Sequence, residues 1–149
     1  MKKSIILIGI VSTLAFASNS TVPVVTDELY IKECGSCHFA YQPQLLPKGS
    51  WAKMMDGLKD HFGTNATLET KEFDDIRSYL ISNSKSGDGP LRISQLRKFR
   101  KEHRDIPSHY ISQKEVGSIS NCSACHTSAE KGSYRERDIY IPNYGRWND

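Results

Sequence analysis

The chain has 149 residues, of which 38% are hydrophobic and 25% are charged. This length suits one domain or two very small ones, and such a short, polar chain builds only a thin core from its own side chains, so we expect another group to supply apolar surface. The formal net charge of +3 is small and gives no support for nucleic-acid binding.

The N-terminus has the features of a secretory signal peptide. Lys2 and Lys3 form a positive region, residues 5–14 are mostly apolar, and the sequence A-F-A at positions 15–17 is a typical cleavage site. The apolar stretch is shorter than the roughly 20 residues that a membrane-spanning helix needs, which argues against an uncleaved anchor. We therefore predict that residues 1–17 are removed on export to the periplasm. The mature chain would then carry 18 basic and 17 acidic residues, with no segment that inserts stably into a membrane.

The first half of the mature chain is predicted to consist of helices joined by one long loop. The sequence T-D-E at residues 26–28 is typical of a capped helix start, and the predicted helix leads toward the first cysteine. A loop containing proline and glycine follows over residues 41–50. Ser50 as an N-cap and Gly63 as a stop signal predict the next helix. Apolar residues at helical spacing predict a further helix over about residues 68–81.

Residues 83–90 have the composition of a linker and predict a domain boundary. We place the N-terminal domain at residues 18–86 and the C-terminal domain at residues 87–149.

The second half is predicted to be less regular than the first. Its first helix should run through Leu96 and Phe99 to His103, and Pro107 should interrupt the chain after it. Another helix is expected over about residues 122–131, ending at Gly132, and a polar tail follows. Strand signals are sparse, so the chain is predicted to be all-α with long loops.

The four cysteines occur in two copies of the pattern C-x-x-C-H. In this pattern both thiols add to the vinyl groups of a haem, and the histidine binds its iron. A thioredoxin-like site needs a βαβ context, which is missing, and disulfides would leave the two histidines unexplained. Export and the repeated spacing favour haem over zinc. We therefore expect two haem c groups, held by Cys34, Cys37 and His38 and by Cys122, Cys125 and His126.

Three of the five histidines remain as second ligands for at most two irons. His61 continues the apolar face of its predicted helix, which includes Met54 and Leu58, and is the predicted partner of His38. Met54 and Met55 are the alternative ligands, and a thioether ligand would raise the reduction potential.

For the second iron the choice is between His103 and His109. Leu96, Phe99 and His103 follow one helical face, which favours His103 because a helix holds a ligand well. His109 follows Pro107, where a turn is expected, and stays the alternative.

A run of basic residues begins before the helix that is predicted to carry His103 and continues through it. Three interpretations are open: a solvated helix face, pairing with haem propionates, or a docking surface for an acidic redox partner. The run consists of Arg92, Arg97, Lys98, Arg100, Lys101 and Arg104.

Several segments outside the cysteine motifs resemble the small dihaem cytochrome c family, whose members are exported bacterial electron carriers. These segments are Y-Q-P-Q-L-L-P at 41–47, S-W at 50–51, H-F-G at 61–63, E-H-R at 102–104 and A-E-K-G at 129–132. The resemblance implies an N-terminal part similar to class I cytochromes c and a less regular, haem-bearing C-terminal part. It also implies bis-histidine coordination, by His38 with His61 and by His126 with His103. Members of the family pass electrons to a monohaem, oxygen-binding cytochrome c.

The favoured function is that of an electron carrier and not an enzyme, because two six-coordinate irons leave no open site for a substrate. The rival is a haem enzyme or gas-binding protein with one five-coordinate iron. A haem-based sensor is a third class, but no segment of the sequence suggests a signalling output.

Overall fold

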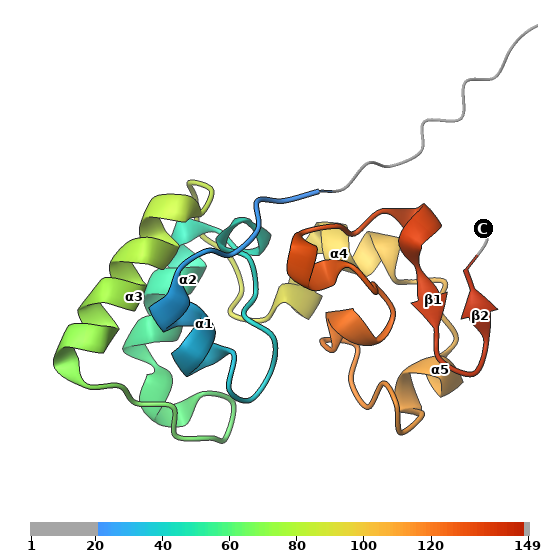
Figure 1. Cartoon of the computed structure of the whole chain (residues 1–149), viewed down its shortest axis with the longest axis horizontal. Coiled ribbons are helices and arrows are strands. Elements are labelled where there is room, and N and C mark those ends of the chain that lie inside the picture. The colour runs from blue at the N-terminus through green and yellow to red at the C-terminus, as the bar shows by residue number, and fades with distance from the viewer. Residues whose placement is uncertain (1–20, 148–149) are drawn as a thin grey trace, which may run out of the picture.

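The computed structural model describes residues 21–147, which form mainly short helices (Figure 1). The mostly helical prediction is therefore confirmed, and the predicted signal peptide lies outside the described residues. Within this described part, no helix is both long enough and apolar enough to cross a bilayer. The elements are α1 (Glu28–Cys34), α2 (Lys48–Asp56), α3 (Thr70–Asn83), α4 (Arg97–Glu102), α5 (Ser108–Ser112) and the strands β1 (Tyr140–Ile141) and β2 (Gly145–Arg146), with short 3₁₀ helices between them.

The hydrophobic core lies in the first half, where α1, α2 and α3 gather (Figure 1). Ile76 and Leu80 are four residues apart on α3 and fully buried, so they lie on one face of the helix. Trp51 and Met55 meet them from α2 with the same spacing. The indole nitrogen of Trp51 also donates a 2.7 Å hydrogen bond to the Pro43 carbonyl, which ties the preceding loop to the core.

α2 is shorter than predicted and ends before His61. It begins after Pro47, so Ser50 lies inside it as a buried residue and not as its N-cap. Gly57 ends the helix because glycine is a poor helix former. The chain continues as a 3₁₀ helix over Leu58–Asp60, and His61 follows at its end.

The segment after α3 packs against the start of α2. The amide of Lys48 donates to the carbonyl of Lys85 at 2.8 Å, and the amide of Gly49 donates to Gly87 at 2.9 Å. The Lys53 ammonium also pairs with Asp88 at 2.8 Å. The stretch with linker composition is therefore held on the first half by backbone hydrogen bonds.

The prediction of one helix over residues 122–131 is wrong. Two 3₁₀ helices, Cys122–Ala124 and Ala129–Lys131, take its place. The sequence N-C-S-A-C-H-T-S is rich in residues of low helix propensity, and Thr127 instead donates a side-chain hydrogen bond to the Asp138 carbonyl. The predicted polar tail also differs, because it forms the β1–β2 hairpin with Ile141 buried.

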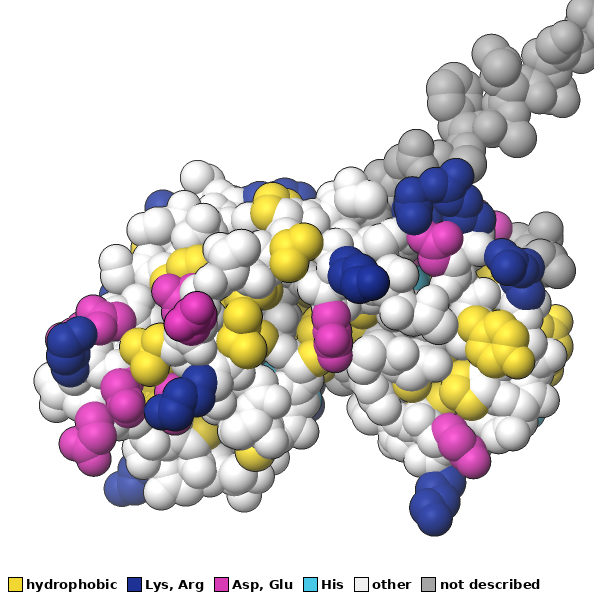
Figure 2. Space-filling model, viewed as in Figure 1, with side chains coloured by type: hydrophobic (Ala, Val, Ile, Leu, Met, Phe, Trp, Pro, Cys, Tyr) yellow, Lys and Arg dark blue, Asp and Glu magenta, His cyan; other side chains and the backbone are white. Residues whose placement is uncertain are grey.

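The two halves form two lobes with a notch between them (Figure 2), and the start of the described chain reaches across to the second half. The amide of Val22 donates to the carbonyl of Gly132 at 2.8 Å. Gly132 has a φ of +74°, and a Cβ atom there would lie 2.0 Å from the Val22 carbonyl oxygen. Glycine is therefore required at this crossing.

The core assignment predicts the effect of truncating α3. Replacing Ile76 with alanine should lower the free energy of unfolding by about 2–5 kcal/mol, because the cavity left in a closed core cannot fully collapse. Ser78→Ala changes an exposed position of the same helix and should alter it by no more than about 0.5 kcal/mol. Denaturant titration of the holoprotein measures both, and equal midpoints for the two variants would contradict this core.

Candidate functional site

The first site consists of His38 and His61, whose ring centres lie 6.2 Å apart with planes inclined by 27°. A metal–imidazole bond is about 2.0 Å and the ring centre lies about 1.1 Å further, so two imidazoles on opposite sides of one metal ion have centres about 6.2 Å apart. The spacing therefore fits one ion between the rings. The Nδ1 atom of His38 lies 2.9 Å from the Phe39 carbonyl oxygen. Since a carbonyl only accepts, Nδ1 carries the proton and Nε2 is free for the metal.

The second site consists of His103 and His126, with ring centres 6.1 Å apart and planes inclined by 64°. His103 caps the C-terminus of α4, and its Nδ1 donates to the Phe99 carbonyl at 2.8 Å. The Phe99 ring also stacks on the His103 ring at 3.9 Å, almost parallel. These two contacts hold the imidazole in one orientation.

His109 is not part of this pair. It lies exposed in α5, where its ring packs on Tyr110 at 4.1 Å. The structure therefore brings His103, and not His109, next to His126.

A largely apolar cavity of about 430 Å³ surrounds the first histidine pair. Its lining includes both cysteines of the first motif, and it extends to Phe99 and Cys122 of the second half, so the two sites adjoin. Met54 and Met55 both line the same cavity, and Met55 is also buried in the core. Within residues 21–147, no three His, Cys, Asp or Glu side chains converge as a bare metal ion would need. A porphyrin would supply the equatorial ligands that the protein lacks.

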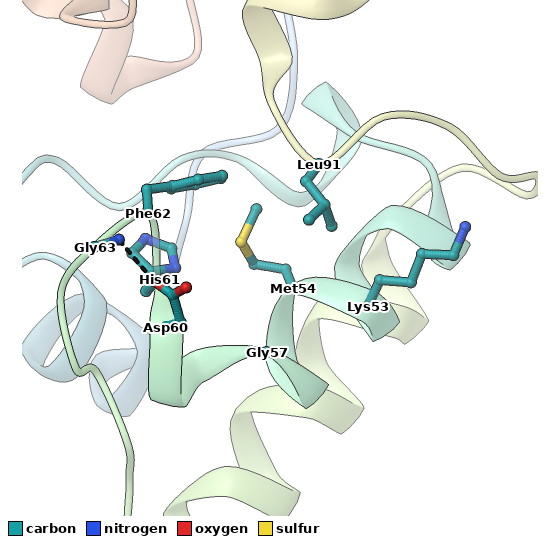
Figure 3. Close-up of a pocket in the computed structure, with 8 residues that line it drawn as sticks. All are labelled: Lys53, Met54, Gly57, Asp60, His61, Phe62, Gly63 and Leu91. Atoms are coloured by element: carbon teal, nitrogen blue, oxygen red, sulfur yellow. Dashed lines mark hydrogen bonds between the residues drawn. The ribbon is translucent and has the colours of Figure 1, made fainter.

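A strained turn fixes the position of His61. Phe62, which follows it, has a φ of +56°, a conformation that bulky residues rarely adopt. The turn is closed by hydrogen bonds between His61 and Thr64, and Gly63 donates its amide to the Asp60 carboxylate at 2.8 Å. In Figure 3, His61, Phe62, Met54 and Leu91 surround a neighbouring hollow of about 360 Å³. The Arg92 guanidinium lies 3.9 Å from the Phe62 ring centre, a cation–π contact that holds the turn from outside.

The cysteines of both motifs are free thiols in the structure. Burial raises the pKa of Cys34 and of Cys122 to about 11, so both are uncharged at neutral pH. The absence of disulfides among the described cysteines leaves all four sulfur atoms available for thioether bonds.

Two tyrosines and a glutamine connect the two sites, and the sequence did not predict their roles. Tyr41 packs against His38 at 5.0 Å, and Tyr134 packs against His126 at 5.3 Å. Gln42 is fully buried; its amide donates to the Ala129 carbonyl at 2.7 Å and accepts from the Tyr134 hydroxyl at 2.6 Å. Gln42 belongs to the family-like segment at 41–47, but that segment did not indicate its contacts, because glutamine is usually exposed and both its partners lie far along the chain.

Comparisons with known proteins identify the family of this chain. Residues 30–134 match the family described as dihaem cytochrome c. The dihaem c-type cytochrome of Shewanella baltica is 38% identical over 81% of this chain and 97% of its own, with a TM-score of 0.75. One structure of the dihaem cytochrome c of Rhodobacter sphaeroides is 42% identical over 74% of this chain and 99% of its own, with a TM-score of 0.69. A second structure from the same organism is 38% identical over 76% of this chain and 100% of its own, with a TM-score of 0.70. No curated protein matches the chain.

A helical fold with two C-x-x-C-H motifs defines a c-type cytochrome. The chain belongs to the dihaem cytochrome c family, and it carries two haem c groups.

The connection through Gln42 gives a prediction about stability. Gln42→Leu removes the amide, leaves the Tyr134 hydroxyl without its acceptor and leaves the Ala129 carbonyl with the Gly132 amide as its one remaining donor, which should cost about 1–3 kcal/mol of unfolding free energy. Gln95→Leu, at an exposed position, is the matched control. Guanidinium denaturation of the two holoproteins measures the difference. If the variants unfold at the same denaturant concentration, Gln42 does not join the halves as described.

Proposed function

We propose that this protein is a periplasmic electron carrier in which two histidines bind each haem iron. The observation that carries the proposal is the pair of imidazole spacings, 6.2 Å and 6.1 Å, each of which suits one iron between two rings. The proposed ligands are His38 and His61 for the first iron and His126 and His103 for the second. The proposed thioether bonds are those of Cys34 and Cys37 and of Cys122 and Cys125.

The side chains around the irons support electron transfer over substrate chemistry. When bound, each haem supplies a one-electron Fe(III)/Fe(II) couple. The paired imidazoles leave no position for a substrate, and the cavity around the first pair has a largely apolar lining that suits a porphyrin. The carbonyls of Phe39 and Phe99 accept the Nδ1 protons of His38 and His103, which fixes the orientation of both rings.

The proposed partner is another redox protein, since a carrier without an open iron must exchange electrons with other molecules. The family resemblance suggests a monohaem, oxygen-binding cytochrome c as that partner. The signal features of residues 1–17 support export, and hence a periplasmic location.

Electron paramagnetic resonance of the oxidised protein tests the ligand assignment. The wild-type protein should give two low-spin signals. His61→Ala and His103→Ala should each convert one of them to high spin, because each removes one axial ligand, whereas His109→Ala should leave both low-spin. A high-spin signal in the wild type, or carbon monoxide binding to its reduced form, would favour a haem enzyme or gas-binding protein with one five-coordinate iron.

The intact mass of the periplasmic protein tests the haem attachment and the export. We expect residues 18–149 plus two covalently bound haems. Replacing both Cys122 and Cys125 by alanine should lower the mass by one haem beyond the change in side chains. Replacing both Cys34 and Cys37 by alanine should lower the mass by the same amount. A colourless wild-type protein, or one that loses both haems on acid–acetone extraction, would contradict covalent attachment.

A further inference from the structure

α4 has two chemically different faces. Leu96, Phe99 and His103 follow one stripe, and Phe99 and His103 belong to the haem sites. A neighbouring face carries basic residues at positions i, i+3, i+4 and i+7, the spacing of one helical stripe, and the last of them lies just beyond the end of α4. This basic stripe consists of Arg97, Arg100, Lys101 and Arg104, all of which are exposed.

The charge of the basic stripe is poorly compensated. Residues 91–104 contain six basic side chains and one acidic side chain. Among the described residues, the one ion pair that a stripe member forms joins Arg104 to its neighbour Asp105 at 3.1 Å. Arg97 and Lys101 are four residues apart within α4, a like-charge spacing that destabilises a helix, whereas the helix dipole favours Arg100 and Lys101 in the last turn. The stripe therefore presents charge that the described fold leaves largely unpaired.

The basic stripe is not placed to neutralise the first haem. Arg92 lines the cavity of the first pair and contacts Phe62, whereas no stripe residue is among the cavity's lining residues. The four side chains are exposed to solvent. They are therefore available to an external molecule.

α4 also lies close to both irons' proposed ligands. It carries His103 at its C-terminus, and Phe99 lies between the His103 ring and the first cavity. Along the long axis of the molecule, α4 lies between α1–α3 and the β hairpin (Figure 1). A molecule on its outer face would be about one helix diameter, ~10 Å, from His103.

We propose that the basic stripe is the docking surface for a redox protein with acidic side chains around its own cofactor, so that electrons pass through the His103 side of the second haem. This inference rests on the electron-carrier function proposed above. Complementary charge mainly accelerates the encounter and orients the partner, as electron-transfer complexes that form and separate quickly require.

The test compares two one-electron donors of opposite charge on the complete holoprotein. Reduced plant-type ferredoxin is the acidic protein donor, and the methyl viologen radical cation is the positively charged small donor. In each reaction the donor loses one electron and an oxidised haem iron gains it. The variant carries Arg97→Glu, Arg100→Glu and Lys101→Glu. Its rate with ferredoxin, measured by stopped flow, should fall about tenfold or more at low ionic strength.

The same difference should shrink at high salt, where surface charges are screened. The rate with methyl viologen should not fall, and the optical spectrum and reduction potentials should match the wild type. A control with the same change in net charge carries Lys48→Glu, Lys85→Glu and Lys114→Glu, all at exposed positions outside α4. This control should keep most of the ferredoxin rate.

Four results would overturn the proposal. Equal slowing of the two triple variants would mean that net charge alone matters. Slowing with both donors, or a changed haem spectrum, would mean that the stripe acts on the haem itself. A wild type with low-spin haems that reacts with viologen but shows no salt effect with ferredoxin would remove the docking surface and leave the carrier function intact. If neither donor reduces the wild type, the carrier function fails, and the docking proposal fails with it.

Discussion

The structure depends on two pairs of imidazoles that face each other across a gap of about 6 Å. In each pair, 23 residues of sequence separate the two histidines, so the intervening chain must form a closed loop around the gap. The first loop packs against the hydrophobic core that includes Ile76 and Leu80. The second half of the chain has far fewer buried apolar residues, among them Val116 and Ile141. A bound porphyrin therefore contributes a larger share of the apolar contacts in the second half.

The spatial relation of the two sites is fixed by polar groups and not by a shared apolar core. The Tyr41 hydroxyl donates to the Ser120 carbonyl at 2.6 Å, and Gln42 bonds to two groups of the second half. Burial raises the pKa of Tyr41 to about 12, so it stays a neutral donor over the physiological range. A buried network in which each member has a partner defines one geometry. The two cofactors are therefore held at one mutual distance and orientation.

Local pattern was sufficient to predict the covalent motifs, the capped start of α1 and the mostly helical fold. It failed where neighbouring elements compete with the helix. His61 was expected on a continuous helix, yet it reaches the cavity through a turn made possible by Gly57 and the left-handed Phe62. The roles of Gln42 and Arg92 were not predictable, because their contacts join segments that periodicity does not relate. Helical spacing did place Phe99 and His103 on one side of the same segment, where the two rings stack.

The hydrogen bond between Val22 and Gly132 joins positions that are almost the full described length apart in sequence. Contacts of such high sequence separation carry a large loop-closure cost and form late. The first half has its core within residues 25–96, so its own contacts can form before those that join it to the second half. Closure at Gly132 then completes the molecule, so assembly has a direction, from a preformed first lobe to a second lobe that is locked onto it.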